Sequence, residues 1–208
     1  MAKRGFFITL EGPEGSGKSS QCRLLAQALK DSGRKVATAC DPGSTDLGQA
    51  LRQLLLHSRR RISPMAEAML FFAARVQLVQ EYVRPALAKG KIIIVDRYHD
   101  STVAYQGFGA GVDVECLERL GRSAVEGVMP DLTILLDLPV NEGFLRLKRS
   151  KDRMEKKARA LHERVRRGYR ALARRDPKRI VMVPASGTQE AIAKRIFAVV
   201  SERLLSKA

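Results

Sequence analysis

Eight residues near the N-terminus have the types and spacing of a phosphate-binding loop. Residues 12–19 read Gly-Pro-Glu-Gly-Ser-Gly-Lys-Ser, a complete G-x-x-x-x-G-K-[ST] pattern. Glycines allow a tight turn in which successive backbone N–H groups face one anion. We expect Lys18 to reach the β- and γ-phosphates of a nucleotide and the Ser19 hydroxyl to bind Mg²⁺. The candidate nucleotide contacts are therefore Gly12, Pro13, Glu14, Gly15, Ser16, Gly17, Lys18 and Ser19.

The residues on either side of this loop agree with that interpretation. Residues 6–10 form a short apolar run that is typical of a buried strand. After the loop, Leu25 and Leu29 recur at helical spacing, and Gly33 is a helix stop. Strand, glycine-rich loop and helix N-terminus follow one another in the order that the motif requires. A glycine-rich turn that contains lysine by chance would not be expected to have both a buried strand before it and a helix after it.

Apolar strand-like runs alternate with helical patterns along the rest of the chain. Strands are predicted at 5–11, 35–40, 91–96, 132–138 and 179–184, and helices at 17–32, 46–58, 64–89, 113–127, 140–149, 155–175 and 187–204. This alternation predicts an α/β fold with a parallel sheet covered by helices on both faces. Ligands of such sheets bind beyond the carboxyl ends of the strands. The chemistry is therefore expected just after Leu10, Ala39, Val95 and Leu138.

The third predicted strand ends in residues that could bind an anion. Arg97 follows an apolar strand, and a cation placed there needs a negative partner. That partner is either Asp96 or a substrate phosphate held by two hydrogen bonds. In the second case Asp96 would support the metal site through water. Further on, Thr102, Tyr105 and Gln106 share one helical face, with Ser101 beside them.

Three other segments are less specific on their own. Asp41-Pro42 begins a turn after the second strand. Phe71 and Arg75 lie one helical turn apart, as a surface cation–π pair would, or as an aromatic ring and a donor that recognise a base. Residues 149–155 are rich in cations and lie between two helices. An arginine on such a closing segment can stabilise a phosphoryl group in transfer and exclude water.

Inside the predicted helix at 64–89, apolar residues recur as one stripe from Ala68 to Leu87. Ser63 and Pro64 form a good helix start, and Pro85 should kink the helix near its end.

Composition narrows the class of protein. The 208 residues suit one domain with a substantial core, and no stretch approaches the ~18 apolar residues of a membrane helix. Three scattered cysteines and no visible signal peptide lead us to expect a cytoplasmic protein. The net charge is +16, and residues 146–179 hold 16 Lys/Arg against four Asp/Glu. Such a segment could bind nucleic acid, cover a polyphosphate, or form a solvated helix face.

Taken together, the motifs resemble those of the thymidylate kinase family. The matching segments are 11–19, Asp41-Pro42-Gly43-Ser44-Thr45, 70–77, Asp96-Arg97-Tyr98 with 101–107, Asp152-Arg153-Met154-Glu155, and 162–166. Order and spacing hold over roughly residues 5–185. The resemblance implies a P-loop NTPase-like three-layer sandwich, in which helices cover both faces of a five-stranded parallel sheet. It also implies one nucleoside monophosphate kinase domain over 1–208, with a short lid at about 149–156.

The resemblance further implies transfer of the ATP γ-phosphoryl group to dTMP with Mg²⁺, usually in a homodimer. Arg97 would then grip the dTMP phosphate and Phe71 would stack on thymine. Arg75, Thr102 and Gln106 look like contacts to the base edge, Tyr105 like the residue that favours deoxyribose, and Glu14 like the residue near the 3′-hydroxyl. The implied substrate-binding set is Glu14, Asp41, Pro42, Phe71, Arg75, Arg97, Ser101, Thr102, Tyr105 and Gln106. The implied metal residues are Ser19 and Asp96.

Family members differ in where they place a catalytic arginine. This phosphate loop has none, whereas the lid has Arg149 and Arg153. The chain therefore resembles the bacterial type with a lid arginine, and we expect Arg153 to be catalytic along with Lys18 and Arg97, with Arg149 as a further ATP contact. Cys40 and Ala110 stand where many relatives have arginine.

Other functions remain to be weighed against this one. A kinase for another nucleoside monophosphate or for a nucleoside would need the same phosphate loop. A GTP-binding switch would resemble its class in an Asn-Lys-x-Asp motif, which this sequence lacks. A basic nucleic-acid-binding protein is the remaining class, but no recognised motif supports it. His57, His99 and His162 are isolated, and we expect them at the surface or at helix ends.

Overall fold

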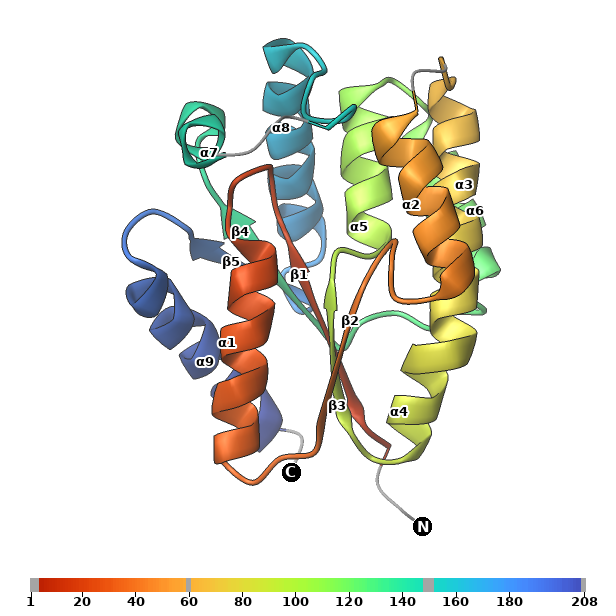
Figure 1. The fold of residues 1–208 in the computed structure, drawn as a ribbon. Helices are drawn as coiled ribbons and strands as arrows, with labels where there is room; N and C mark the ends of the chain where they lie inside the picture. Colours follow the sequence, from red (N-terminus) through yellow and green to blue (C-terminus); the bar gives the residue numbers. More distant parts are fainter. Residues whose placement is uncertain (1–3, 59–60, 148–151, 207–208) are drawn as a thin grey trace.

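One parallel sheet forms the centre of the molecule (Figure 1). The computed structural model describes residues 4–58, 61–147 and 152–206. Its strands are β1 (Phe6–Glu11), β2 (Val36–Cys40), β3 (Ile92–Asp96), β4 (Leu132–Asp137) and β5 (Ile180–Pro184). They are hydrogen-bonded in the order β2-β3-β1-β4-β5, and each pair is parallel. Each of the predicted strands is confirmed to within one residue at either end.

The three inner strands explain why the sheet was readable from sequence. In β1, β3 and β4 nearly every side chain is buried, because helices cover both faces. Each therefore appears as a predominantly apolar run without polar alternation. The edge strand β2 is only partly buried.

Helices lie on both faces of the sheet. They are α1 (Lys18–Asp31), α2 (Asp46–His57), α3 (Pro64–Leu78), α4 (Arg84–Ala88), α5 (His99–Thr102), α6 (Val114–Ala124), α7 (Val140–Arg146), α8 (Arg159–Arg175) and α9 (Gln189–Leu205). Helices α1 and α9 pack on one face, where Ile8, Leu10 and Ile94 join their apolar residues in one cluster. Helices α3, α6 and α8 lie on the opposite side, over Phe7, Ile93 and Leu135. The predicted three-layer α/β fold is thus confirmed.

The long helix predicted at 64–89 is present but interrupted. Its regular part, α3, gives way to a π-helical segment η1 (Val79–Val83), which leads into α4. The interruption immediately precedes Pro85, which cannot donate a backbone hydrogen bond and whose ring clashes with the preceding turn. A π-turn widens the helix at this point and accommodates the proline. Ser63 caps the start of α3 as predicted, by accepting a hydrogen bond from Ala66 N at 3.4 Å.

One helical segment was absent from the predicted helix ranges, although Thr102, Tyr105 and Gln106 were expected to share a helical face. Helix α5 continues into the π-helical segment η2 (Val103–Gly109), so residues 99–109 are helical throughout. Its first turn, His99-Asp100-Ser101-Thr102, is polar yet buried, so it shows no amphipathic period. This helix follows the carboxyl end of β3 and carries much of the site described below.

The two helices predicted on either side of the lid were also too long. Helix α7 ends at Arg146 instead of residue 149, and α8 begins at Arg159 instead of residue 155. Residues 153–156 form turns. In the described part of the chain, no helix is both long enough and apolar enough to cross a membrane.

Candidate active site

The phosphate loop connects β1 to α1 and can be built only with glycine at its turning points. Gly12 and Gly15 have φ of 143° and 71°, a region that other residues rarely adopt. A Cβ atom on Gly15 would lie 2.0 Å from the Gly143 carbonyl oxygen, and one on Gly12 would lie 2.5 Å from that of Leu136. The loop leads into the N-terminus of α1, where the helix dipole favours an anion.

Lys18 lies folded back on this loop. Its ammonium group donates to the carbonyl oxygens of Gly12 at 3.0 Å and Pro13 at 2.8 Å, and to Ser16 Oγ at 3.2 Å. Burial, together with repulsion from Arg97, lowers the pKa of Lys18 to about 8. A polyphosphate would supply the negative charge that this buried cation lacks.

Ser19 and Asp96 lie together at the adjoining ends of α1 and β3. The Ser19 hydroxyl donates to Asp96 Oδ2. Asp96 Oδ1 is buried and has no hydrogen-bond partner among the described residues. A hydroxyl and a free carboxylate oxygen are hard donors that fit Mg²⁺. Among the described residues, no three His, Cys, Asp or Glu side chains are grouped so that they could hold a metal ion by themselves, so phosphate oxygens and water would complete the coordination.

Arg97 occupies the centre of the site in a strained backbone conformation. Its φ of 66° is unfavourable for a residue with a side chain and marks a position held by its surroundings. The guanidinium lies 2.9 Å from the Glu14 carboxylate and 5.2 Å from the centre of the Tyr105 ring. From sequence, the negative partner of Arg97 was expected to be either Asp96 or a substrate phosphate. In the structure, the carboxylate that forms an ion pair with Arg97 is that of Glu14.

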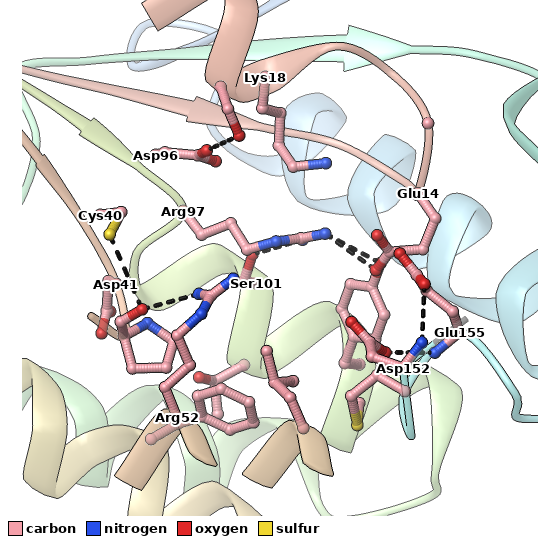
Figure 2. Close-up of a pocket in the computed structure, with 18 of the residues that line it drawn as sticks. Glu14, Lys18, Cys40, Asp41, Arg52, Asp96, Arg97, Ser101, Asp152 and Glu155 are labelled. Atoms are coloured by element: carbon pink, nitrogen blue, oxygen red, sulfur yellow. Dashed lines mark hydrogen bonds and ion pairs between the residues drawn. The ribbon is translucent and has the colours of Figure 1, made fainter. Parts of the chain in front are cut away.

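Glu14 is the counter-charge of this arginine. Desolvation raises its pKa, but Arg97, Lys18 and a 2.6 Å hydrogen bond from the Tyr105 hydroxyl outweigh that effect and lower the pKa to about 2. Glu14 therefore stays ionised at any physiological pH. Figure 2 shows Arg97 reaching across the cavity toward Glu14, with Lys18 and Asp96 on the phosphate-loop side.

A second carboxylate, which the sequence interpretation gave no role, supports Arg97 from behind. Glu11 is fully buried at the end of β1 and accepts hydrogen bonds from Tyr98 N, Ser101 Oγ and Tyr169 Oη. Burial and the nearby Asp100 raise its pKa to about 7. Ser101 and Tyr169 in turn lie 3.2 Å and 3.3 Å from the Arg97 guanidinium. The signal in the sequence was a glutamate in an otherwise apolar strand.

At the other end of the cavity, Arg75 is buried rather than on the surface. Its Nε lies 2.5 Å from Asp41 and its Nη2 3.0 Å from the Thr102 hydroxyl. The interpretation as a surface pair with Phe71 was wrong: Arg75 is 1% exposed, and the rings beside it are those of Phe72 and Tyr98. Arg75 Nη1 has no partner among the described residues, so this donor is free for a ligand.

A single cavity of about 470 Å³ joins these groups. Every predicted substrate-binding residue lines it: Glu14, Asp41, Pro42, Phe71, Arg75, Arg97, Ser101, Thr102, Tyr105 and Gln106. Gly15, Gly17, Lys18, Ser19 and Asp96 line it as well, whereas Gly12, Pro13 and Ser16 are buried and do not line it. Cys40, Arg52, Asp152 and Glu155 are also part of the wall and had been given no role.

One of the two lid arginines, Arg153, does not lie where it was expected. Arg153, expected over the transferring phosphoryl group, is not among the residues that line the cavity. Its guanidinium lies 2.6 Å from the Leu55 carbonyl oxygen and 3.1 Å from Glu67. These two contacts hold it against α2 and α3, so in this structure it faces away from the phosphate loop. Arg149, the other predicted lid residue, lies outside the described residues.

Part of the basic segment is paired with acidic residues within the molecule. Described ion pairs join Lys157 to Glu67, Arg166 to Asp137, Arg175 to Glu118, and Arg179 to Asp100 and Asp176. Many of its cations therefore hold α8 and the lid to the rest of the fold. The histidines were expected at the surface or at helix ends, and His57 is exposed in the last turn of α2. His99 begins α5 and His162 lies in the first turn of α8, but neither is at the surface, because they are 1% and 2% exposed. Both are buried because α6 and α7 pack over them: His99 lies against Gly121 and His162 against Phe144.

Comparisons with known proteins agree with this geometry. The model of the thymidylate kinase family matches residues 10–196. A thymidylate kinase of Synechococcus is 44% identical over 198 residues, covering 95% of each chain. That of Thermomicrobium roseum is 44% identical over 200 residues, also 95% of each chain. The crystal structure of the Ehrlichia chaffeensis thymidylate kinase superposes with a TM-score of 0.79 at 30% identity, covering 95% of this chain and 99% of that one. The chain belongs to the thymidylate kinase family.

Proposed function

We propose that this protein transfers the γ-phosphoryl group of ATP to dTMP, giving dTDP and ADP. The observation that carries the proposal is the continuity of one cavity from the phosphate loop at Lys18, past Arg97, to the aromatic and polar residues at Phe71 and Gln106. Such a cavity could hold two phosphate groups end to end, with a flat ring at the far side. Family membership supplies the identity of the acceptor.

The acceptor would lie between Arg97 and Arg75. Arg97 would hold its phosphate through a planar fork of donors, which suits a phosphate oxygen pair. Phe71 is half-buried and its ring can stack on the base. Arg75 Nη1, with no partner in the described chain, would donate to a base carbonyl. Tyr105 Oη, held by Glu14, would face the sugar.

The donor would lie on the phosphate loop. Backbone N–H groups and Lys18 would bind the β- and γ-phosphates. Ser19 and Asp96 would hold Mg²⁺, which bridges phosphate oxygens and neutralises developing charge when bound. The acceptor phosphate is already anionic near neutral pH and needs no general base. Catalysis therefore depends on positioning and on charge at Lys18 and Arg97.

The lid would supply one more cation. With Arg153 engaged by Glu67, we assign that role to Arg149, the second lid arginine of the sequence. The proposal treats residues 1–208 as one kinase domain with a lid at about 149–156 that acts in the cytoplasm. It also includes a homodimer, for which the exposed apolar side chains Met65 and Met69 on α3 and Tyr82 on η1 offer a surface.

The experiment that tests this function measures ADP release from ATP and Mg²⁺ with each nucleoside monophosphate. Strong preference for dTMP over dUMP, dCMP, dGMP and dAMP is the expected result. Equal turnover of several acceptors would retain a kinase but contradict the thymine site. ATP binding without ADP release for any acceptor would contradict the function, and salt-dependent binding to DNA would then point to the basic segment.

A further inference from the structure

Glu67, on the first turns of α3, is a fully buried carboxylate beside the base end of the cavity. It is 1% exposed, and its side chain accepts hydrogen bonds from three different residues. The amide nitrogen Nε2 of Gln106 lies 3.3 Å from Oε2. Arg153 Nη2 lies 3.1 Å from Oε1, and Lys157 Nζ lies 2.8 Å from Oε2.

Two of these donors are cations that form ion pairs with the carboxylate. A buried carboxylate without a counter-charge is costly, and two cations within hydrogen-bond distance offset that cost. Arg153 belongs to the lid, and Lys157 lies between the lid and α8. An ionised carboxylate has no proton to give, so Glu67 can act only as an acceptor.

This fixes the orientation of the Gln106 amide. Because Glu67 accepts only, Gln106 must turn its NH₂ group toward it, and the carbonyl oxygen Oε1 is left for other partners. Gln106 lines the cavity, and no described residue donates to Oε1. The cavity therefore offers an acceptor at Gln106 and a donor at Arg75 Nη1.

An acceptor beside a donor matches one class of pyrimidine. Thymine and uracil carry a hydrogen on N3 and a carbonyl at O4, so they complement Gln106 Oε1 and Arg75 Nη1. Cytosine has the reverse pattern, with an unprotonated N3 and an amino group at N4, and would leave buried groups unpaired.

We propose that Glu67 is a specificity-determining positioning residue, which orients the Gln106 amide to accept from N3–H and so favours thymine and uracil over cytosine. This inference rests on the proposed dTMP kinase function. Glu67 acts through Gln106 and has no contact of its own with the base.

The test is Glu67→Gln, which keeps the size of the side chain but can donate as well as accept. The new amide can give a hydrogen to Gln106 Oε1, which lets the Gln106 NH₂ group face the cavity. We expect the ratio of kcat/KM for dTMP to that for dCMP to fall by ~10-fold or more, as for one hydrogen bond to the base edge. The ratio for dTMP over dUMP should stay unchanged, because these acceptors differ only in the 5-methyl group.

A matched control is Glu163→Gln on α8, a glutamate that is partly exposed and 4.0 Å from Arg159. It should leave both ratios as in the unmodified protein. An unchanged dTMP/dCMP ratio in Glu67→Gln would overturn the inference. An equal fall in the dTMP/dCMP and dTMP/dUMP ratios would also overturn it, because it would indicate a general loosening of the site and not a loss of selection at N3. If the unmodified protein does not phosphorylate dTMP at all, the proposed function itself fails.

A second measurement checks the route through Gln106. In a Gln106→Leu background no amide remains to be oriented, so Glu67→Gln should have no further effect on the dTMP/dCMP ratio. A full additional fall in that background would place the effect of Glu67 elsewhere. If Glu67→Gln folds poorly, Lys157→Met, which removes one donor from the same carboxylate at a partly exposed position, should move the dTMP/dCMP ratio in the same direction.

Discussion

Arg97 and Glu14 form an ion pair across the mouth of the phosphate loop, with 2.9 Å between guanidinium nitrogen and carboxylate oxygen. Their side chains are 21% and 15% exposed, so the pair is shielded but can be reached by a ligand. Glu14 compensates the charge of Arg97 in the free protein, and an incoming phosphate would share that role. The strained backbone of Arg97 is held in place by this pair and by the groups around Ser101.

Replacing Arg97 should remove the grip on the acceptor phosphate. In Arg97→Met the kcat/KM for dTMP is expected to fall by ~10²–10³-fold, since a fork of charge-assisted hydrogen bonds is lost. ATP affinity should change little. The kcat/KM of Arg97→Lys should lie between those of the unmodified protein and Arg97→Met, because lysine keeps the charge but not the fork of donors. Normal kcat/KM in a coupled ADP-release assay would contradict the assignment; Arg119→Met, on the exposed side of α6, is the control.

The pair between Arg75 and Asp41 should dominate the stability of the base end. Both side chains are at most 1% exposed and lie 2.5 Å apart. Asp41→Asn leaves a buried, uncompensated guanidinium and is expected to lower the free energy of unfolding by about 3–5 kcal/mol. The exposed pair Arg84–Glu126 is the comparison, since Arg84→Met should cost only about 0–1 kcal/mol. Urea unfolding of the two variants measures the difference, and equal losses would contradict the prediction.

Nucleotide binding should take up a proton at Lys18. Its pKa in the free protein is lowered to about 8 by burial and by Arg97, so the amine loses its proton as the pH rises through that value. A bound polyphosphate favours the charged form and raises the pKa again, so ATP affinity should weaken above this pH. Calorimetry in buffers of different ionisation enthalpy should show proton uptake at about pH 9 and much less at about pH 7. In Lys18→Arg the side chain is always charged, and uptake should disappear; uptake that persists would assign the proton to another group.

Replacing Arg149 and replacing Arg153, the two lid arginines, should have different effects. Arg149→Met is expected to lower turnover by ~10²–10⁴-fold for every acceptor, as the loss of a cation over the transferring phosphoryl group would. Arg153→Met instead removes a partner of Glu67, so its main effects should be a lower melting temperature and weaker selection against dCMP. Steady-state kinetics with dTMP and dCMP separates these outcomes. A uniform loss of turnover in Arg153→Met would restore the catalytic role that the sequence first suggested.

The sequence by itself determined the sheet, the phosphate loop and most of the residues that line the cavity. Local patterns were enough: predominantly apolar runs for β1, β3 and β4, a fixed spacing of glycines and Lys18 for the loop, and motifs of the family for the far end. Chemistry at the carboxyl ends of parallel strands then followed from topology.

Only the tertiary structure decided which charged groups face one another. Arg75 meets Asp41 across 34 positions, and Arg153 meets Glu67 across 86. Neither pair leaves a local period in the sequence, because burial of a charge depends on what other elements bring to it. For the same reason the polar helix α5 was missed and Arg153 was assigned to the phosphoryl group. Periodicity and motif spacing report on neighbours along the chain, whereas the partners of buried charges are set by packing.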